Sequence, residues 1–101
     1  MNVTYEVTAV VPHELADQFE EYMTSRHLAD VLATGHFEAA TFSRTGGKYR
    51  VTYVAHSRQS LDQYLARDTD RLRADFQAHF PTGVDLSREI WDVVKTFGPT
   101  D

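Results

Sequence analysis

The chain has 101 residues, which is enough for one hydrophobic core and too few for two. Its 42% hydrophobic and 25% charged residues are typical of a folded globular protein and exclude a disordered one. Ten basic against fifteen acidic residues give a net charge of -5, which disfavours nucleic acid as a partner, and the lack of cysteine excludes disulfides and thiolate metal sites.

The first predicted element is a strand from Val3 to Val11. Its odd-numbered residues are apolar and its even-numbered residues are mostly polar, an alternation that gives a strand one buried face. The start of the chain lacks a basic region followed by an apolar run, so we expect no secretory signal. No segment reaches the roughly 20 apolar residues of a membrane span, so we expect a cytoplasmic protein with no membrane partner.

A helix is predicted next, beginning at Pro12, which suits a first helical turn. An apolar stripe recurs at every fourth position of this helix and includes one histidine. The stripe consists of Leu15, Phe19, Met23, His27 and Val31. Thr34 and Gly35 end the helix.

Two β-type runs, 36–44 and 48–56, surround a turn with the sequence Thr45-Gly46-Gly47. The two glycines indicate a tight hairpin with a positive φ at both residues. Counting outward from the turn pairs Phe37 with His56 and sorts the side chains to two faces. One face receives Phe37, Ala39, Thr41, Arg50, Thr52, Val54 and His56, and the other receives Ala40, Phe42, Tyr49, Val51 and Tyr53.

A second helix is predicted from the serines at 57 and 60 to Pro81. Its buried stripe consists of Leu61, Leu65, Leu72, Phe76 and Phe80. Residues 87–97 form the last predicted strand, in which apolar groups on both sides leave the face of Trp91 undecided. Residues 98–101 form a loose tail, so the single predicted domain covers residues 1–97.

The predicted order of elements is therefore βαββαβ. The compact solution for this order is an α+β, ferredoxin-like fold, in which a four-stranded antiparallel sheet carries two helices on one face. The other face would have few charges and considerable apolar content. We expect a second copy of the chain to cover it, in a homodimer.

Residues 27–40, HLADVLATGHFEAA, carry a histidine followed by V-L-x-T-G-x-F and a strand of small residues. This pattern resembles the signature of an uncharacterised domain-of-unknown-function family, and the runs at 3–11, 49–53 and 64–80 fit the family as well. That family is similar to the dimeric α/β-barrel superfamily, in which two ferredoxin-like subunits pack sheet to sheet around a cavity. The resemblance implies the fold and the dimer. It implies no single reaction, because the superfamily includes cofactor-free monooxygenases, haem-degrading or haem-binding enzymes, muconolactone isomerases and stress-responsive proteins.

His27 has two interpretations. A histidine on an apolar helix stripe is commonly a core residue whose ring is hydrogen-bonded to a backbone carbonyl. The second interpretation is a catalytic one, a proton shuttle or a haem ligand at the mouth of a cavity, because imidazole titrates near neutrality and binds metals. The sequence leaves both open.

Three further ionisable groups, Glu6, Arg50 and His56, are assigned to the sheet face away from the helices. Glu6 and Arg50 would form a salt bridge with each other, since a buried charge needs a partner. Alternatively, Arg50 would hold a carboxylate or enolate while His56 or Glu6 acts as the catalytic base. The other candidate ligand contacts on this face are Thr41, Thr52, Phe37 and Trp91.

The sequence predicts no metal site and no cofactor, because the five histidines form no close helical pair and no phosphate-binding glycine loop occurs. The preferred function is a homodimer that binds a small molecule between the sheet and the partner subunit, and it extends to a cofactor-independent enzyme that acts on a small organic acid. One alternative is a structural or protein-interaction module with a dry dimer core. Another is haem binding or degradation through His27 or His56. A cavity of several hundred cubic ångströms would favour ligand binding over a structural role.

Overall fold

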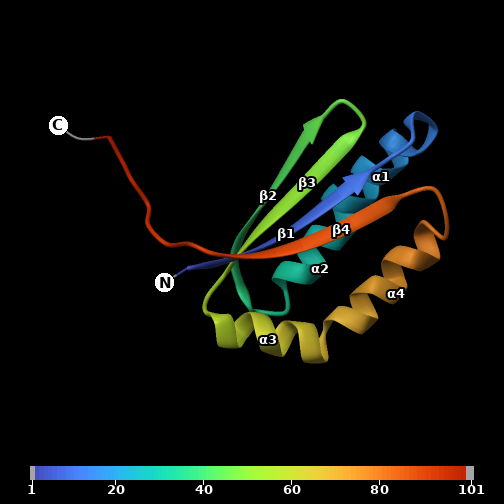
Figure 1. The fold of residues 1–101 in the computed structure, drawn as a ribbon. Helices are drawn as coiled ribbons and strands as arrows, with labels where there is room; N and C mark the ends of the chain where they lie inside the picture. The colour runs from blue at the N-terminus through green and yellow to red at the C-terminus, as the bar shows by residue number, and fades with distance from the viewer. Residues whose placement is uncertain (1, 100–101) are drawn as a thin grey trace.

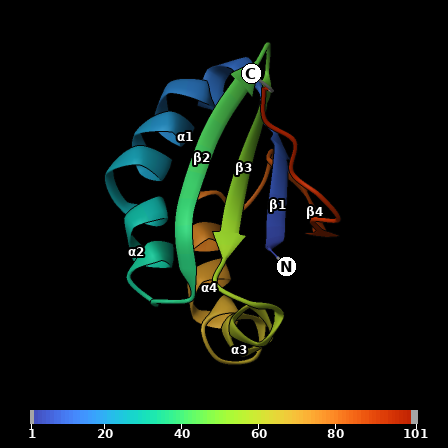
Figure 2. The same cartoon turned by 90° about the vertical axis from the view of Figure 1, so that its left-hand side faces the viewer.

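A computed structural model describes residues 2–99 and contains one four-stranded antiparallel sheet with helices on one of its faces (Figures 1 and 2). The strands are β1 (Val3–Val10), β2 (Phe37–Thr45), β3 (Lys48–Ala55) and β4 (Asp85–Asp92). Their spatial order is β2-β3-β1-β4, so β1 and β3 are central. This is the α+β, ferredoxin-like arrangement that the order of elements predicts.

The helical region after β1 changes its winding along its length. It consists of a 3-10 turn η1 (His13–Leu15), α1 (Ala16–Tyr22), a π-helical turn η2 (Met23–His27) and α2 (Leu28–Leu32). The spacing of the apolar stripe explains the π-helical turn.

Phe19 and Val31 are twelve residues apart, and an uninterrupted α-helix would place them about 120° apart around its axis. The wider turn takes up one extra residue and reduces this angle to about 20°. Both side chains are therefore buried against the sheet, with 2% and 1% of their surface exposed.

The second predicted helix is two helices, α3 (Arg58–Arg67) and α4 (Thr69–His79). The chain bends between them at Asp68, where φ is -111° and ψ is -28°. The Asp68 carboxylate lies 3.3 Å from Nε2 of His36, and this contact ties the bend to the segment before β2. As a result α3 lies near one end of the sheet and α4 runs along its face (Figures 1 and 2).

The hairpin register is confirmed from Thr45–Lys48 to Ala39–Val54. The predicted turn geometry is wrong at one position, because Gly46 has a φ of +57° and Gly47 has no positive φ. Gly47 is required for another reason. Val11 N–H donates to its carbonyl oxygen at 2.9 Å, and a Cβ on Gly47 would lie only 3.2 Å from Val11 O.

Phe37 does not pair with His56, and its predicted place on the sheet face away from the helices is wrong. The register shifts between Phe37 and Ala39, so Glu38 is an extra residue and Phe37 pairs with Ala55. One extra residue reverses which face a strand residue points to. The Phe37 ring is therefore buried on the helix side, 4.9 Å from the Tyr64 ring.

The last strand begins two residues earlier and ends five residues earlier than the predicted 87–97. Val3 opposes Asp92, and Val93 N–H still donates to the Asn2 carbonyl oxygen at 2.9 Å. Residues 93–99 form no strand or helix, and this segment runs away from the sheet (Figure 1). Of the tail predicted at 98–101, residues 100 and 101 lie outside the described residues. Trp91 opposes Thr4, which settles its position on the face away from the helices.

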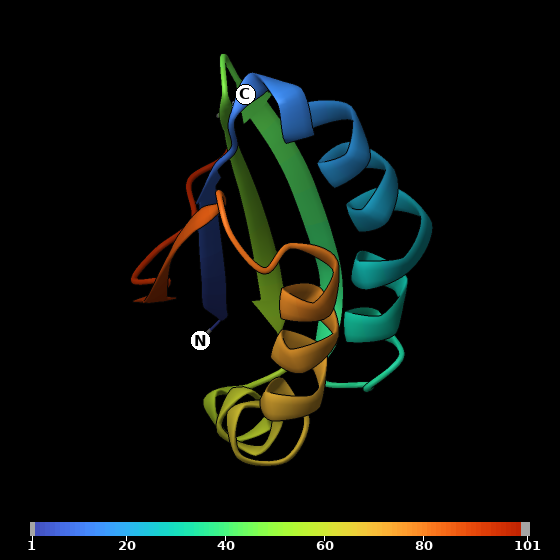
Figure 3. The same ribbon diagram turned by 90° about the vertical axis from the view of Figure 1, so that its right-hand side faces the viewer.

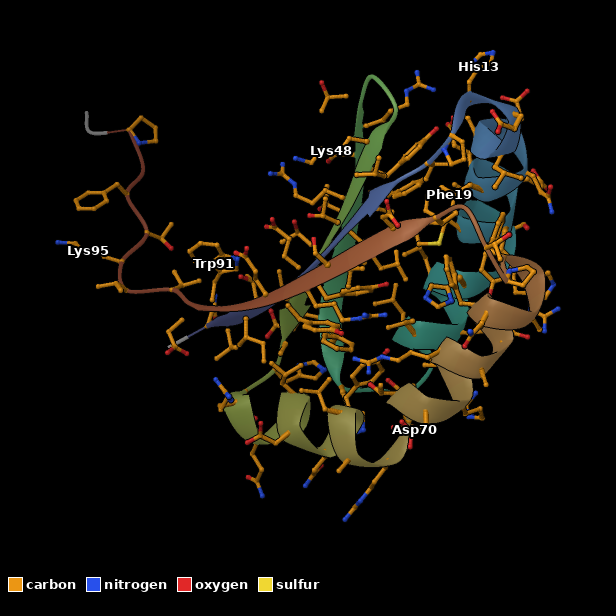
Figure 4. The ribbon with its side chains drawn as sticks, turned by 45° about the vertical axis from the view of Figure 1, so that its right-hand side comes forward. His13, Phe19, Lys48, Asp70, Trp91 and Lys95 are labelled. Carbon is orange, nitrogen blue, oxygen red and sulfur yellow. The ribbon has the colours of Figure 1, made fainter. Side chains whose placement is uncertain are left out.

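An aromatic cluster centred on Phe19 joins the helices to the sheet (Figure 4). The ring lies 4.9 Å from Tyr49 of β3, 5.8 Å from Phe80 and 6.2 Å from Phe76 of α4, measured between ring centroids. Rings at these distances add specific contacts to the burial of their apolar area. Phe19 is therefore the residue whose loss should matter most to the core.

We predict that Phe19→Ala lowers the free energy of unfolding by about 3–5 kcal/mol, because it leaves a cavity beneath three other rings. Chemical denaturation measures this directly. The control is Gln18→Ala, which removes an exposed side chain from the same helix and should change the free energy of unfolding by less than about 0.5 kcal/mol. Equal effects of the two substitutions would show that the helix face is wrongly assigned.

Candidate functional site

A cavity of about 280 Å³ lies between the sheet and the helices that cover it. Figure 3 shows these two layers, with the sheet on one side and α1, α2 and α4 on the other. Residues from β1, β3 and β4 line one side, and residues from α1, η2 and α4 line the other. The lining residues important for its chemistry are Tyr5, Tyr53, Tyr64, His27, Arg73 and Arg88.

Aromatic rings form much of the cavity wall. The rings of Tyr5 and Tyr53 stack with centroids 5.9 Å apart, and Tyr64 packs against Tyr5 at 6.2 Å. Burial raises the pKa of Tyr53 far above its usual value and that of Tyr64 to about 12. These phenols therefore stay neutral at physiological pH and can donate hydrogen bonds to a ligand.

The charged groups of the cavity are basic. Arg88 of β4 opposes Val7, which places it on the helix-covered face, and Arg73 comes from α4. Neither arginine forms an ion pair within residues 2–99. No Asp or Glu is among the described lining residues, although the chain has fifteen acidic residues. The cavity is thus lined by cationic groups in an acidic protein, and both arginines are exposed residues.

His27 lies in the π-helical turn and lines the cavity. Burial lowers its pKa, the carboxylates of Asp75 and Asp30 raise it, and the guanidinium of Arg88 lowers it further. Its Nδ1 lies 3.5 Å from the Tyr22 hydroxyl and is not bonded to a backbone carbonyl. The imidazole is therefore held neutral at physiological pH in a partly enclosed position.

Asp75 of α4 connects the two helical regions behind His27. Its carboxylate accepts a hydrogen bond of 2.7 Å from the Tyr22 hydroxyl and two from Arg26, at 2.7 and 3.1 Å. The Tyr22 bond and the Arg26 charge lower the pKa of Asp75, and burial together with Asp75 raises the pKa of Tyr22. Asp75 is therefore a carboxylate and Tyr22 a neutral phenol at physiological pH.

The sheet face away from the helices, here called the uncovered face, carries most of the sequence-predicted site residues. Glu6 and Arg50 line one hollow of about 250 Å³ near the hairpin, but they form no salt bridge with each other. The cross-strand pairs Thr41–Thr52 and Thr4–Trp91 place Thr41, Thr52 and Trp91 on the same face. The structure therefore groups these residues apart from His27.

His56 lies one residue beyond β3 and is separated from Glu6 and Arg50. Its Nδ1 lies 3.6 Å from the Glu38 carboxylate, the extra residue of the bulge. Phe37 belongs to the core for the reason given above. His56 and Phe37 therefore do not join the hollow of Glu6 and Arg50.

The described residues form no group of three His, Asp or Glu side chains that could hold a metal ion. Within residues 2–99, no helix is long and apolar enough to cross a lipid bilayer. Neither finding adds to the chemistry of the cavity.

The sequence matches one family model over residues 2–94, that of the domain of unknown function DUF4286. The chain belongs to the DUF4286 family. This agrees with the resemblance inferred from the sequence at the level of the family. A search of curated protein sequences gave no significant match to this DUF4286 chain.

Solved structures similar to the DUF4286 chain share its fold at low sequence identity. SnoaB, a cofactor-independent oxygenase from Streptomyces nogalater, is 17% identical with a TM-score of 0.75, and the match covers 97% of this chain and 98% of SnoaB. A dimeric ferredoxin-like protein from an uncultured marine organism is 16% identical with a TM-score of 0.69, covering 95% and 98%. An antibiotic biosynthesis monooxygenase is 15% identical with a TM-score of 0.68, covering 92% and 99%. At these identities the similarity shows the fold alone.

Sequence reasoning missed Arg88, Tyr22 and Asp75. Arg88 is two residues from both Leu86 and Ile90, so it shares a strand face with these apolar residues. No hairpin joins β4 to β1, so only tertiary packing sets the register between the two strands. Tyr22 and Asp75 are 53 residues apart, so no local pattern connects them. For Arg88, the alternation in the last strand was the one available signal.

We predict that stability falls as the pH is lowered from about 7.5 to about 5.5, and that His27→Gln reduces this fall. The pKa of His27 is lowered in the folded state, so below the unfolded value of about 6.5 the unfolded chain binds more protons and stability decreases. Denaturant titration at the two pH values measures the difference. The exposed residue His13 supplies the control, since His13→Gln should leave the pH dependence unchanged. An unchanged pH dependence in His27→Gln would contradict the prediction.

Proposed function

We propose that this chain binds a small aromatic acid in the cavity between the sheet and the helices, with the anionic group of the ligand at Arg88. The observation that carries the proposal is an aromatic-lined cavity in which, among residues 2–99, two arginines have no ion-pair partner and no carboxylate lines the wall. Small-molecule sites are typically concave and apolar, with a few convergent polar groups.

The volume and the wall chemistry support a flat ligand of one or two rings. Small-molecule pockets usually enclose about 300–1,000 Å³, and this cavity, at about 280 Å³, is near the lower end. The rings of Tyr5, Tyr53 and Phe76 offer surfaces on which a planar ligand can stack. A macrocycle such as haem exceeds this space, which makes haem the weaker alternative.

The charge of the cavity supports an acidic ligand. A guanidinium keeps its charge when water is excluded and binds a carboxylate through two parallel hydrogen bonds. Arg88 and Arg73 line the same cavity without an ion-pair partner among the described residues. An anion between or beside them would supply that partner. Hydroxyl donors such as that of Tyr53 would add orientation.

The fold adds independent support for small-molecule binding. SnoaB, which is similar to this chain in fold, is described as a cofactor-independent oxygenase, so the architecture can hold an organic substrate. Whether this chain is an enzyme depends on a group that can take up a proton, and His27 is the candidate within the cavity.

The uncovered face remains a second candidate for the ligand site. The shared hollow of Glu6 and Arg50 favours it, with Arg50 as the anion-binding residue and Glu6 as the base. Thr41, Thr52 and Trp91 would then contact the ligand, and His56 would have to reach across from the strand end. Apart from Tyr49, the described lining of this hollow is polar or charged, whereas many rings line the cavity, so the hollow is the less suitable of the two.

We predict that naphthoate raises Tm by about 5 °C or more once its concentration exceeds Kd tenfold, and that the uncharged naphthamide does not. Arg88→Gln should abolish the rise, because it removes the charge that faces the cavity. Arg50→Gln is the matched control and should keep it. Thermal unfolding, monitored by fluorescence, gives Tm for the wild-type protein and for both variants.

The two sites give opposite outcomes in this experiment. Loss of the rise in Arg50→Gln and its retention in Arg88→Gln would move the site to the uncovered face. No rise with naphthoate or with other one- and two-ring carboxylates in the wild-type protein would reject acid binding and favour the structural module.

We also propose that two copies pack through their uncovered faces. Exposed apolar side chains gather where β4 ends and in the segment after it, with Trp91 51%, Val94 87% and Phe97 80% exposed. Burial of apolar area contributes roughly 25 cal/mol per Å² to association. A protein of this fold is described as dimeric, which supports a dimer.

We predict that Trp91→Glu weakens this dimer at least tenfold in Kd, because it brings a charge into an apolar contact. Sedimentation equilibrium measures the dissociation constant. Leu32→Glu introduces the same charge at an exposed apolar residue on the helix side and should leave the dimer unchanged. A wild-type chain that stays monomeric at micromolar concentration would contradict the dimer.

A further inference from the structure

The Tyr22 hydroxyl fixes which nitrogen of His27 carries a proton. A phenol has one hydrogen to donate, and Tyr22 donates it to Oδ2 of Asp75 at 2.7 Å. Nδ1 of His27 lies 3.5 Å from the same hydroxyl oxygen. Because the phenol hydrogen is already used, the oxygen can only accept from the imidazole. This contact, although long for a hydrogen bond, favours the tautomer of the neutral ring that carries its hydrogen on Nδ1.

The position of Tyr22 is itself fixed by Asp75. Arg26 donates to Oδ1 of Asp75 at 2.7 Å from Nη2 and to Oδ2 at 3.1 Å from Nε, so the carboxylate is held on both oxygens. Tyr22 is 6% exposed and its ring lies 5.6 Å from the His27 ring. The imidazole also packs against Phe76, with centroids 5.9 Å apart, and the Tyr22 and Phe76 rings contact each other at 5.8 Å. These contacts restrict the orientation of the imidazole.

The second ring nitrogen is free to act in the cavity. Nε2 of His27 has no hydrogen-bond partner within residues 2–99, and it is not among the buried polar atoms that lack a partner. It is therefore accessible, and His27 is one of the residues that line the cavity. With the hydrogen on Nδ1, Nε2 carries a lone pair.

We propose that Asp75 and Tyr22 are positioning residues that hold the hydrogen of His27 on Nδ1, so that Nε2 accepts a proton from an acidic phenol or enol bound in the cavity. This inference rests on the proposed function, because it requires the cavity to hold the ligand. It adds the base, the orientation of the base and the kind of acidic group that the ligand carries.

The proton transfer needs no further reactant. The O–H bond of the ligand breaks, its electron pair stays on the oxygen as a phenolate or enolate, and the proton forms an N–H bond at Nε2. His27 becomes an imidazolium, which later returns its proton to water. The negative charge formed on the ligand is attracted to Arg88 of β4.

The charges that face His27 come from three elements. Asp75 of α4 and Asp30 of α2 stabilise the imidazolium, whereas Arg88 of β4 opposes it until the ligand anion neutralises the guanidinium. Tyr22 of α1 contributes its dipole and no charge. Ligand ionisation and histidine protonation therefore support each other.

The positioning is tested without any ligand. We expect long-range ¹H–¹⁵N correlation spectra of the wild-type protein at neutral pH to show His27 as the Nδ1–H tautomer. Tyr22→Phe and Asp75→Asn should each shift His27 toward the Nε2–H tautomer. Tyr49→Phe is the matched control, because it removes another buried hydroxyl that donates to a carboxylate, that of Glu20 at 2.8 Å, and should leave His27 unchanged.

The role as proton acceptor is tested with para-nitrophenol, whose anion absorbs visible light and whose neutral form does not. Just below the solution pKa of the probe, we expect the ratio of anion to neutral form to be at least tenfold higher for probe bound to the wild-type protein than for free probe. His27→Gln should abolish the increase, and Tyr22→Phe should reduce it severalfold while naphthoate still raises Tm. Tyr49→Phe should keep it.

The outcomes separate the two proposals. An Nε2–H tautomer in the wild-type protein, or an unchanged tautomer in Tyr22→Phe, overturns the positioning whatever the cavity binds. If naphthoate binds at Arg88 and His27→Gln still ionises para-nitrophenol fully, His27 is not the base, and the proposed ligand site stands. If naphthoate does not bind and the tautomer behaves as expected, the proposed function fails and the proton transfer fails with it.

Discussion

Stiff aromatic side chains keep the first helical region and α4 apart, and the cavity inside the molecule exists because of this separation. Tyr22 meets Phe76 and Phe80 with centroids 5.8 and 5.5 Å apart, and the Asp75 carboxylate spans the same gap with hydrogen bonds. Flat rings cannot change shape to fill irregular space as long aliphatic chains can. A cavity therefore remains over the centre of the sheet, where a two-layer fold would otherwise be closed.

The distribution of charge gives this cavity a character opposite to that of the whole molecule. Acidic side chains do not line the cavity and pair with basic groups on other elements, as Glu20 of α1 does with Arg44 of β2 and Asp75 of α4 with Arg26 of η2. The cavity is lined by neutral phenols, a neutral imidazole and two exposed guanidinium groups that have no ion-pair partner among residues 2–99. A net charge of -5 would repel anions at a distance, so selection of an acidic ligand would have to arise from short-range contacts.

Local patterns in the sequence predicted most of the fold, and the site depended on what they do not encode. The alternation of apolar and polar residues correctly predicted which side chains of β1 face the helices, and the glycine turn predicted the hairpin register as far as Ala39. Both are local signals. The bulge at Glu38 has no such signal, and it moved Phe37 into the core. The bend at Asp68 is stabilised by His36, which comes 32 residues earlier, so a continuous helix was the natural prediction.

The same limit applied to the groups that carry the proposed chemistry. The apolar stripe drew attention to His27, but its neighbour Asp75 comes from a helix that the sequence could not orient. Counting alternate residues from the hairpin turn correctly placed Arg50 on the uncovered face. This result led to the prediction of a ligand site on that face and not on the helix-covered one. Arg88 lies in a strand whose register is set only when the sheet is assembled.

A chain one residue shorter between Met23 and His27 could keep this fold. Removing one residue there would turn the π-helical turn into a regular α-helical one, with Phe19 and Val31 still on one side of the helix. A deletion elsewhere in the helical region would rotate one of these residues out of the core by about 100°. Folding alone therefore tolerates the loss of that residue, but the loss would move the imidazole relative to Tyr22. Among related chains, those with the full-length turn would keep the histidine in the cavity. Those with one residue fewer would keep the fold but not this position of the histidine.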